Sequence, residues 1–431
     1  MKTFLKKILE RILFFWAKQV LNKYRPKIIG ITGSVGKSSA KEAVFAVLRN
    51  NFRVRTNIKN YNNEIGLPLT ILGEKSAGRN LVGWLKIFFE ALRLLAINDR
   101  TYPEILILEM GIDHPGDMKY LVSLVPVDIG IVTNVSAVHL EFFKTIEKIA
   151  KEKSIMVSTL KPGGWGILNS DNKHVQSMKN NVNGRFLTYG LNKEASVRAS
   201  DIDLSYRGEN IAGLSFKLTY NGAVVPVFLP NILADHLVYA ALAAAAVGLT
   251  LGMNLVEVGE ALRNFVPPLG RMHLLKGVNS SLLIDDSYNG SPEATVAALN
   301  VLGKITSPSG RGHKIAVLGD MLELGDYEKM GHQLVGEAVI ANNIDLLVVV
   351  GERAKIIGRT VGDAGLKNIN NFDDSIEAGD YLLHTVKARD MVLIKGSQGM
   401  RMERTVKILL AEPEKAGELL VRQEESWLDK V

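Results

Sequence analysis

Short apolar runs alternate with amphipathic stretches along most of the chain. The runs KIIGIT (27–32), EILILEM (104–110) and DIGIVTNV (128–135) have the length and β-rich composition of buried strands, and residues 39–51 have the apolar period of a helix. Alternation of buried strands with helices is typical of a parallel sheet whose strands are joined by helices. The pattern therefore predicts an α/β fold.

The alternation restarts after the proline pair at 267–268, and this marks a domain boundary. We expect a central domain over residues 29–268 with a mostly parallel sheet, and a Rossmann-like α/β domain over 269–431. Residues 1–28 form a separate N-terminal helix in this prediction. Four apolar runs predict the strands of the last domain, at 281–287, 314–320, 346–351 and 391–397.

Two stretches inside the central domain differ from the rest. Residues 184–230 alternate polar and apolar positions around Gly and Asn turns, which suggests an antiparallel sheet flanking the main one. Residues 236–251 are rich in alanine, and such a helix is expected to pack closely against a neighbour.

The first 28 residues combine an apolar helical face with a strong positive charge. The longest purely apolar run, 12–17, is too short to cross a bilayer, and no small-residue cleavage site follows it. The helix lies either on the protein's own surface or on the anionic cytoplasmic face of a membrane, which its basic and aromatic residues would suit. Seven apolar residues share the broad face: Leu5, Ile8, Leu9, Ile12, Leu13, Phe15 and Trp16.

Residues 81–97 (LVGWLKIFFEALRLLAI) form a second apolar stretch, interrupted at helical spacing by Lys86, Glu90 and Arg93. A buried helix is the simpler interpretation. The alternative is that this helix pairs with the first one or extends the same membrane-facing surface.

The net charge of +7 belongs to the N-terminal segment. The chain has 52 Lys and Arg against 45 Asp and Glu, and setting aside the eight basic residues and one acidic residue of 1–28 leaves 44 of each. The absence of net charge on residues 29–431 argues against nucleic acid as a partner. The sequence has no cysteine, which excludes disulfides, thiolate metal sites and a cysteine nucleophile and fits a cytoplasmic location.

The stretch GSVGKSS (33–39) joins the first predicted strand to a helix. A phosphate loop needs glycines that let backbone N–H groups turn inward, a lysine for the terminal phosphates and a hydroxyl for the metal ion at a helix N-terminus. Gly33, Gly36, Lys37 and Ser38 supply these groups. The spacing departs from the usual loop, because Ile31 stands where the first glycine would be. The alternative is a glycine turn with a surface lysine.

A magnesium ion bound to phosphate needs further oxygen ligands. Glu109 lies at the end of the run 104–110, where such a carboxylate would sit; otherwise it caps the next turn. His139 follows another strand end and is a candidate second metal ligand or a residue that orients a substrate, although a lone histidine can equally be structural.

Seven short motifs, taken in their order along the chain, resemble those of the ATP-dependent Mur ligases of peptidoglycan synthesis. The resemblance runs from about residue 27 to residue 410, and it is greatest to the members that join D-alanyl-D-alanine to a UDP-N-acetylmuramoyl-tripeptide. In this family the loop takes a shorter GxxGK form that starts at Gly33, which accounts for Ile31. The motifs are ITGSVGKSS (31–39), NYNNEIGLP (60–68), LEMG (108–111), TNVSAVHLE (133–141), IDDSYNGSP (284–292), LGDMLELG (318–325) and KGSQGMRME (395–403).

The resemblance implies an ATP-dependent amide ligase that works through an acyl phosphate, with ATP and Mg²⁺ as cofactors and two metal sites. Ser38 and Glu109 would hold one ion and His139 the other. Lys153 lies where the family carries a lysine carbamylated by CO₂, which would complete the second site; otherwise it is a solvated charge on its helix. Lys37, His139 and Lys153 are the expected catalytic groups. The loop residues would bind the nucleotide: Gly33, Ser34, Val35, Gly36, Lys37, Ser38 and Ser39.

The same resemblance assigns further residues, each of which could instead be a polar cap at a strand end. A loop near nucleotide and substrate would contain Asn60, Asn63 and Glu64. The residues that the C-terminal domain brings onto the nucleotide would be Arg271, Asp286, Tyr288 and Asn289. The region that receives the dipeptide would contain Lys395, Ser397 and Arg401.

The sequence departs from the family in two places. Mur ligases carry a domain before the phosphate loop that grips the UDP-sugar, whereas this sequence has only residues 1–29 there; we expect that domain to be missing, which bears on the acceptor. His236 matches the family, but Leu237 and Ala240 replace its amides, which puts adenine contacts there in doubt.

Two other functions stay open at this point. One is a γ-glutamyl ligase similar to folylpolyglutamate synthases, and the other is a membrane-recruited nucleotide-binding scaffold without ligase activity. The motifs at 284–292 and 395–403 have the cell-wall form, which argues against the γ-glutamyl ligase. The retained set of metal and phosphate residues argues against a scaffold: Lys37, Glu109, His139 and Lys153. We expect a cytoplasmic monomer, peripheral at the inner membrane face, with a UDP-muramoyl-peptide and D-alanyl-D-alanine as substrates.

Overall fold

The structure is a computed structural model. It divides into two compact units, the first comprising residues 1–202, 215–229 and 236–266 and the second comprising 203–214, 230–235 and 267–431. The residues that it describes are 2–57, 61–78, 80–136, 140–208, 210–305 and 312–428.

The first unit contains a sheet with helices on both faces. Its helices are α1 (Lys2–Tyr24), α2 (Lys37–Leu48), α3 (Gly66–Leu72), α4 (Leu81–Ala96), α5 (Asp117–Leu124), α6 (Leu140–Phe143), α7 (Ile146–Ser158), α8 (Lys173–Gln176), α9 (His236–Thr250) and α10 (Leu255–Leu262). The strands of its sheet are β1 (Lys27–Thr32), β2 (Val54–Thr56), β3 (Ile105–Glu109), β4 (Ile129–Val132), β5 (Trp165–Asn169), β6 (Arg185–Gly190), β7 (Val197–Arg207), β8 (Asn210–Tyr220) and β9 (Ala223–Pro230). Residues 203–214 of β7 and β8 and the last residue of β9 fall within the second unit.

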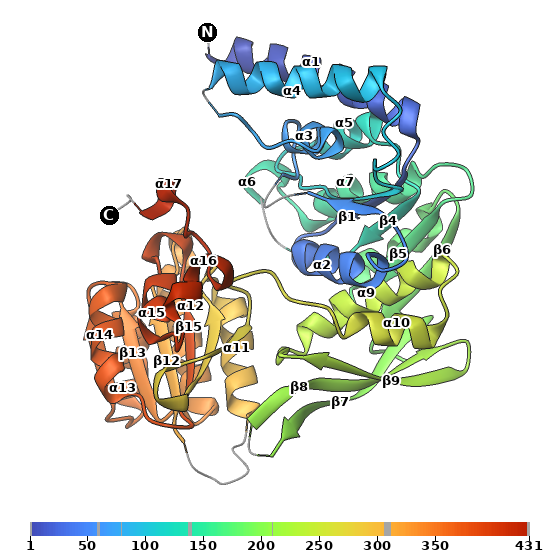
Figure 1. Cartoon of the computed structure of the whole chain (residues 1–431). Coiled ribbons are helices and arrows are strands. Elements are labelled where there is room, and N and C mark those ends of the chain that lie inside the picture. The colour runs from blue at the N-terminus through green and yellow to red at the C-terminus, as the bar shows by residue number, and fades with distance from the viewer. Residues whose placement is uncertain are drawn as a thin grey trace. The chain divides into compact units, whose positions relative to one another are not determined.

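Across the described residues the strands of this sheet follow the order β2-β3-β1-β4-β5-β6-β7-β8-β9. The pairs from β2 to β7 are parallel, with Gly30 of β1 opposite both Leu108 and Gly130. Figure 1 shows α2 and α9 on one side of the sheet and α5 and α7 on the other. The predicted α/β fold with a mostly parallel sheet is confirmed, because helices cover both faces as parallel strands require.

The prediction of an antiparallel sheet flanking the main one at residues 184–230 is wrong in one respect. β6 pairs in parallel with β5, and β7 begins level with the last residues of β6, so these strands extend the main sheet. The turn between β8 and β9 is two residues long, which makes these two strands antiparallel. The alternating pattern therefore indicated antiparallel strands, but it could not show which sheet they join.

Helices α1 and α4 form an outer layer of the first unit. Leu13, Ala17 and Val20 of α1 are buried, and α1 packs on α3. In α4 the buried residues are Ile87, Ala91 and Leu94. The interpretation of residues 81–97 as a buried helix is wrong, because α4 has one buried side and one exposed side. The described helices include none that is both long and apolar enough to span a bilayer.

The alanine-rich helix α9 packs against α2, as its composition predicts. Its residues from Leu237 to Gly248 are almost all buried, and small side chains let two helix backbones approach closely.

The second unit is built on a smaller sheet in the order β10-β11-β15-β12-β13-β14. β10 is antiparallel to β11 and the remaining pairs are parallel, which confirms the Rossmann-like α/β prediction. Its strands are β10 (His273–Lys276), β11 (Leu282–Asp286), β12 (Lys314–Gly319), β13 (Leu346–Val350), β14 (Ile369–Phe372) and β15 (Met391–Lys395). Its helices are α11 (Pro292–Lys304), α12 (Glu328–Ala341), α13 (Lys355–Asp363), α14 (Ser375–Thr385), α15 (Glu403–Leu409), α16 (Ala416–Leu419) and α17 (Glu425–Leu428).

Candidate active site

The predicted phosphate loop lies between β1 and α2, at the carboxyl edge of the first sheet. Gly33 has a φ of 153°, and a Cβ added there would lie 1.9 Å from Thr133 Oγ1, so a larger residue does not fit. Gly36 has a φ of 84° in the left-handed region that glycine adopts at little cost. The two glycines of the motif are thus required by the backbone path.

The loop is held in place by the segment that follows β4. The Ser34 backbone N–H donates to Asn134 O at 2.7 Å, and Thr133 Oγ1 donates to Val35 O at 2.6 Å. The Ser136 backbone N–H donates to Ser34 Oγ at 3.0 Å. These contacts fix the turn before any ligand binds, which is the preorganisation that an anion site needs.

Lys37 is the first residue of α2, and its Nζ donates to Gly33 O at 2.8 Å. Its charge therefore lies within the loop. The first N–H groups of a helix have no partner inside the helix and attract anions. The loop, the lysine and the N-terminus of α2 together have the chemistry of a phosphate site.

Ser38 and Glu109 are brought together as a pair. Ser38 Oγ donates to Glu109 Oε2 at 2.8 Å, and Glu109 is 4% exposed. Asn62 Nδ2 donates to the other oxygen, Glu109 Oε1, at 3.3 Å. A hydroxyl and a carboxylate at this position are the hard oxygen donors that Mg²⁺ prefers.

Sequence reasoning missed two asparagines that hold Glu109. Asn57 Oδ1 accepts from the Glu109 N–H at 2.9 Å, and Asn57 Nδ2 donates to Glu109 O at 3.1 Å. Asn62 lies inside the motif NYNNEIGLP, so it was within reach of the motif argument. Asn57 lies in no recognised motif, and nothing local could have found it.

The other residues predicted in this loop have different surroundings. Asn63 Oδ1 accepts from the Gly66 N–H at 3.0 Å, so it helps to begin α3. Glu64 is half-buried, and Asn60 lies outside the described residues.

Lys153 is buried in α7, with 2% of its surface exposed. The interpretation of Lys153 as a solvated charge is therefore wrong. Burial lowers the pKa of Lys153 to about 7, and the nearby Lys37 charge acts in the same direction, whereas Asp113 and Glu152 oppose them. Glu152 Oε1 itself accepts from the backbone N–H groups of Gly116 and Met118, each at 3.0 Å. Lys153 is thus a buried amine that can lose its proton near neutral pH.

His139, the predicted ligand of a second metal ion, lies outside the described residues. Among the residues that are described, no three His, Asp or Glu side chains gather into a group suited to a metal ion.

In the second unit three motifs converge at the carboxyl ends of β11, β12 and β15. Lys395 Nζ lies 2.5 Å from Asp286 Oδ2 and donates to Asn289 O at 3.0 Å. Ser397 Oγ accepts from the Leu322 N–H at 2.8 Å. Lys395, predicted for the dipeptide, is therefore in direct contact with Asp286 and Asn289, which are predicted for the nucleotide.

Arg271 and Arg401 have aromatic or acidic partners. The Arg271 guanidinium lies 4.2 Å from the centre of the Tyr288 ring. Arg401 Nε donates to Glu403 Oε1 at 2.6 Å, and Arg422 Nη1 donates to Glu403 Oε2 at 2.8 Å. Sequence reasoning did not single out Glu403 or Arg422, which lie at the centre of this buried cluster.

Comparison with known proteins identifies the chain. A model of the Mur ligase middle domain matches residues 89–248, and a model of the Mur ligase glutamate ligase domain matches 270–398. The UDP-N-acetylmuramoyl-tripeptide–D-alanyl-D-alanine ligase of Mycobacterium tuberculosis (strain CDC 1551 / Oshkosh) is 30% identical over 89% of this chain and 73% of its own. This chain belongs to the Mur ligase family.

Two further relatives agree with that assignment. The enzyme of the same name from Bacillus subtilis (strain 168) is 29% identical to this Mur ligase, over 92% of this chain and 79% of the relative. The crystal structure of MurF ligase from Thermotoga maritima in complex with ADP is similar with a TM-score of 0.74 and 26% identity, covering 94% of this chain and 84% of that one.

Proposed function

We propose that this Mur ligase joins D-alanyl-D-alanine to a UDP-N-acetylmuramoyl-tripeptide, using ATP, in peptidoglycan synthesis. The observation that carries the proposal is the contact between Ser38 Oγ and Glu109 Oε2 beside a glycine loop that also holds Lys37. The nature of the acceptor and of the dipeptide follows the names of the Bacillus subtilis and Mycobacterium tuberculosis relatives.

The reaction takes two steps. A carboxylate oxygen of the tripeptide attacks the γ-phosphorus of ATP, the bond to the ADP oxygen breaks, and an acyl phosphate forms. The amine of D-alanyl-D-alanine then attacks the acyl carbon, phosphate leaves with the bonding electrons, and the amine loses a proton. The first step joins two negatively charged groups, so neutralisation of charge dominates its barrier.

The residues of the loop fit this task. Lys37 and the first N–H groups of α2 bind phosphate oxygens. Ser38 and Glu109 would hold a magnesium ion, which when bound neutralises phosphate charge. Asn62 keeps the Glu109 carboxylate turned toward Ser38 by its hydrogen bond to the second oxygen.

We also propose that Lys153 becomes carbamylated and that, with His139, it would hold a second metal ion. A neutral amine attacks CO₂ and releases a proton, which leaves a carbamate whose single negative charge is shared by two oxygen ligands. The burial of Lys153 supports this, because burial favours the neutral amine that the reaction consumes.

The roles inferred for the second unit stay predictions. Arg271, Asp286, Tyr288 and Asn289 are assigned to the nucleotide, and Lys395, Ser397 and Arg401 to the dipeptide. Alanine variants at the two sets separate these roles, because the first set is expected to raise KM for ATP and the second to raise KM for the dipeptide.

We propose in addition that the chain associates peripherally with a membrane through the basic helix α1. The support is the cluster of basic residues in 1–28, since the remainder of the chain has no net charge.

The ligase proposal is tested by phosphate release from ATP. We expect release only when ATP, UDP-N-acetylmuramoyl-tripeptide and D-alanyl-D-alanine are all present, with the amide product seen by mass spectrometry. Omitting each component in turn is the control. Turnover with a folate and glutamate in place of these substrates would instead identify a γ-glutamyl ligase, and no turnover with any acceptor would favour a scaffold.

A further inference from the structure

Helix α4 turns an almost wholly apolar side toward solvent. Val82, Leu85, Phe89 and Leu92 recur at intervals of three or four, so they form one stripe along the helix. A continuous apolar patch of this kind on a globular protein marks a contact surface. Six large residues of α4 and the position after it are each between 51% and 79% exposed: Leu81, Val82, Leu85, Phe89, Leu92 and Ile97.

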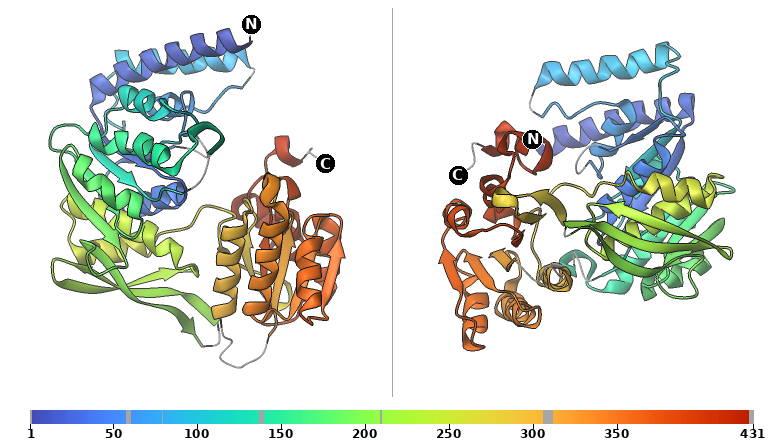
Figure 2. Two further views of the ribbon diagram at one scale, coloured as in Figure 1. Left: turned by 180° about the vertical axis from the view of Figure 1, so that it is seen from behind. Right: turned by 60° about the horizontal axis from the view of Figure 1, so that its bottom comes forward.

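Helix α1 packs against α4 and carries exposed apolar residues of its own (Figures 1 and 2). Its residues Ile8, Ile12 and Phe15 are also exposed. The two helices are fastened at their C-terminal ends, where Lys23 Nζ donates to Leu94 O at 2.8 Å and Tyr24 OH donates to the same oxygen at 2.9 Å. We call the exposed apolar residues of both helices the α1–α4 surface.

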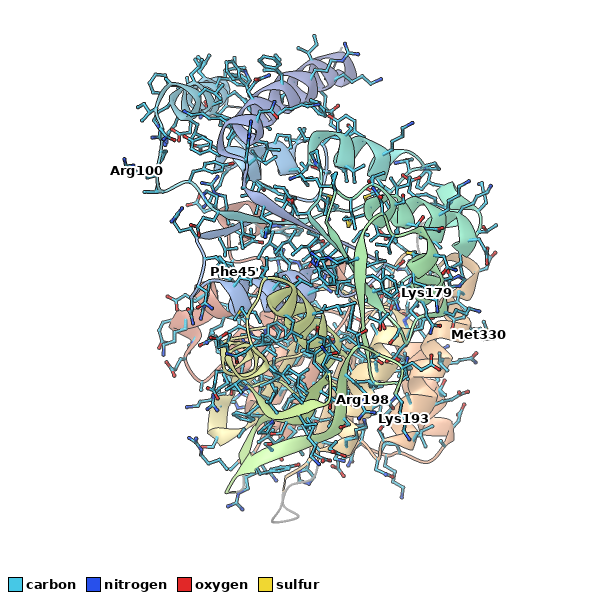
Figure 3. The ribbon with its side chains drawn as sticks, turned by 90° about the vertical axis from the view of Figure 1, so that its right-hand side faces the viewer. Phe45, Arg100, Lys179, Lys193, Arg198 and Met330 are labelled. Atoms are coloured by element: carbon cyan, nitrogen blue, oxygen red, sulfur yellow. The ribbon has the colours of Figure 1, made fainter. Side chains whose placement is uncertain are left out.

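The charge around the α1–α4 surface is positive. The acidic residues on these helices and just after α4 are paired, Glu10 with Lys6 at 3.4 Å and both Glu90 and Asp99 with Arg93, at 2.6 and 3.2 Å. Figure 3 shows Arg100, just beyond α4, projecting away from the body of the unit. The exposed basic residues that border the surface are Lys7, Arg11, Lys18, Lys86 and Arg100.

The exposed apolar stripe and the positive charge around it together indicate the kind of partner that fits the α1–α4 surface. A second copy of the chain would bring the same positive border against the first, and like charges repel. An anionic lipid surface offers negative headgroups for the border and an acyl boundary for the stripe. Lys86, which lies among the apolar residues, can extend its ammonium back to the headgroups while its stem stays in the apolar region.

We propose that the α1–α4 surface inserts into the headgroup region of an anionic bilayer, with α4 as the inserting helix. The proposal rests on the membrane association proposed above and adds the element that enters the lipid. α1 supplies charge, and α4 supplies the apolar area.

Flotation with vesicles tests the proposal. The intact protein is mixed with vesicles of phosphatidylcholine and phosphatidylglycerol, or of phosphatidylcholine alone. We expect binding to the anionic vesicles and a loss of at least about tenfold in the variant Leu85→Ser/Phe89→Ser, because each fully buried large apolar side chain contributes more than that. The matched control is Val224→Ser/Val256→Ser, which removes apolar residues that are 54% and 62% exposed from β9 and α10 and is expected to bind as the unchanged protein does.

A fluorescent label tests depth independently of affinity. The sequence has no cysteine, so Phe89→Cys carries the only thiol and can be labelled with an environment-sensitive dye. We expect a blue shift and protection from aqueous quencher on adding anionic vesicles, and no change for a label at Val256→Cys.

Each outcome has a distinct meaning. If the unchanged protein binds neither type of vesicle, membrane association and the inserting helix are both wrong, while the ligase assay stands apart. If Leu85→Ser/Phe89→Ser binds anionic vesicles as the unchanged protein does, only the role of α4 is wrong. If that variant instead abolishes self-association seen by light scattering, the surface is a contact between copies and the proposal fails.

Discussion

Ser38 Oγ and Glu109 Oε2 lie 2.8 Å apart, although 71 positions separate the two residues in the chain. The parallel pairing of β1 with β3 explains the contact, because Ile31 stands opposite Glu109 in the register. The chain leaves both strands at the same edge of the sheet, so the hydroxyl in the first turn of α2 meets the carboxylate that ends β3. The pair is thus produced by sheet register.

We predict that Glu109→Gln lowers kcat by at least about a hundredfold, because a charged ligand is removed from a site where phosphate charge must be neutralised. Ser38→Ala is expected to act in the same direction and to raise the Mg²⁺ concentration needed for half-maximal rate. Phosphate release over a Mg²⁺ titration measures both. Ser158→Ala, a hydroxyl removed from the exposed end of α7, serves as the control. A Glu109→Gln enzyme with unchanged kcat would contradict the metal assignment.

Lys153 makes stability depend on pH. Its pKa is lowered to about 7 by burial, below the ordinary lysine value of about 10.4. Between these values the unfolded chain binds the proton and the folded chain does not, so the free energy of unfolding rises with pH. Below pH 7 both states are protonated, and the folded state retains the full desolvation cost.

We therefore predict that the unchanged protein gains up to a few kcal/mol of stability between about pH 7 and pH 9 relative to Lys153→Met, which lacks the titrating group. Urea unfolding in buffers freed of CO₂ measures the difference, since carbamylation would otherwise contribute. Asp113 and Glu152 oppose the lowering of the Lys153 pKa, and the value of about 7 already includes their effect. Parallel stability curves for the two proteins would contradict the prediction.

The sequence predicted those parts of the fold that depend on the local pattern of apolar residues and turns. It did not predict contacts that depend on the pairing of strands far apart in the chain. The strand at 27–32 and the helix after it were evident from apolar runs and a glycine turn, and the motif named Lys37, Ser38 and Glu109. Asn57 carries no local signal, because its role depends on β2 and β3 being neighbours.

The helix α4 shows a second limit of the sequence. The apolar residues of 81–97 look like those of a core helix, and only the tertiary contacts of Ile87, Ala91 and Leu94 show that the rest of the helix is exposed. Apolar composition predicts that a helix face will be removed from water. It does not show whether the protein's own core or an external partner such as a lipid bilayer covers that face.

Glu403 is 1% exposed and accepts hydrogen bonds from two buried guanidinium groups, those of Arg401 and Arg422. We predict that Glu403→Gln destabilises the chain by roughly 3–5 kcal/mol, because it leaves buried positive charges uncompensated. Urea unfolding followed by far-ultraviolet circular dichroism measures the change. Glu412→Gln, which removes a carboxylate from an exposed ion pair with Lys415, is expected to change stability by less than about 1 kcal/mol. Equal effects of the two substitutions would contradict the argument.

Variants of the ion pair between Lys395 and Asp286 separate two free energies. One is the cost of burying a charge without its partner, and the other is the net contribution of the pair to stability. Lys395 is 3% exposed, and its Nζ lies 2.5 Å from Asp286 Oδ2. Asp286→Asn leaves the ammonium buried without its partner charge, so we predict a loss of about 3–5 kcal/mol.

The double variant Lys395→Met/Asp286→Asn is expected to recover most of that loss, because neither position of the pair then carries a charge. Lys355 and Glu352 form the matched control, since their ion pair has the same length of 2.5 Å but Glu352 is 81% exposed. Lys355→Met should change stability by less than about 1 kcal/mol. Activity separates structure from function. A double variant that regains stability but stays inactive shows that the pair also serves binding of the nucleotide or the dipeptide, whereas recovery of both stability and activity would assign the pair to folding alone.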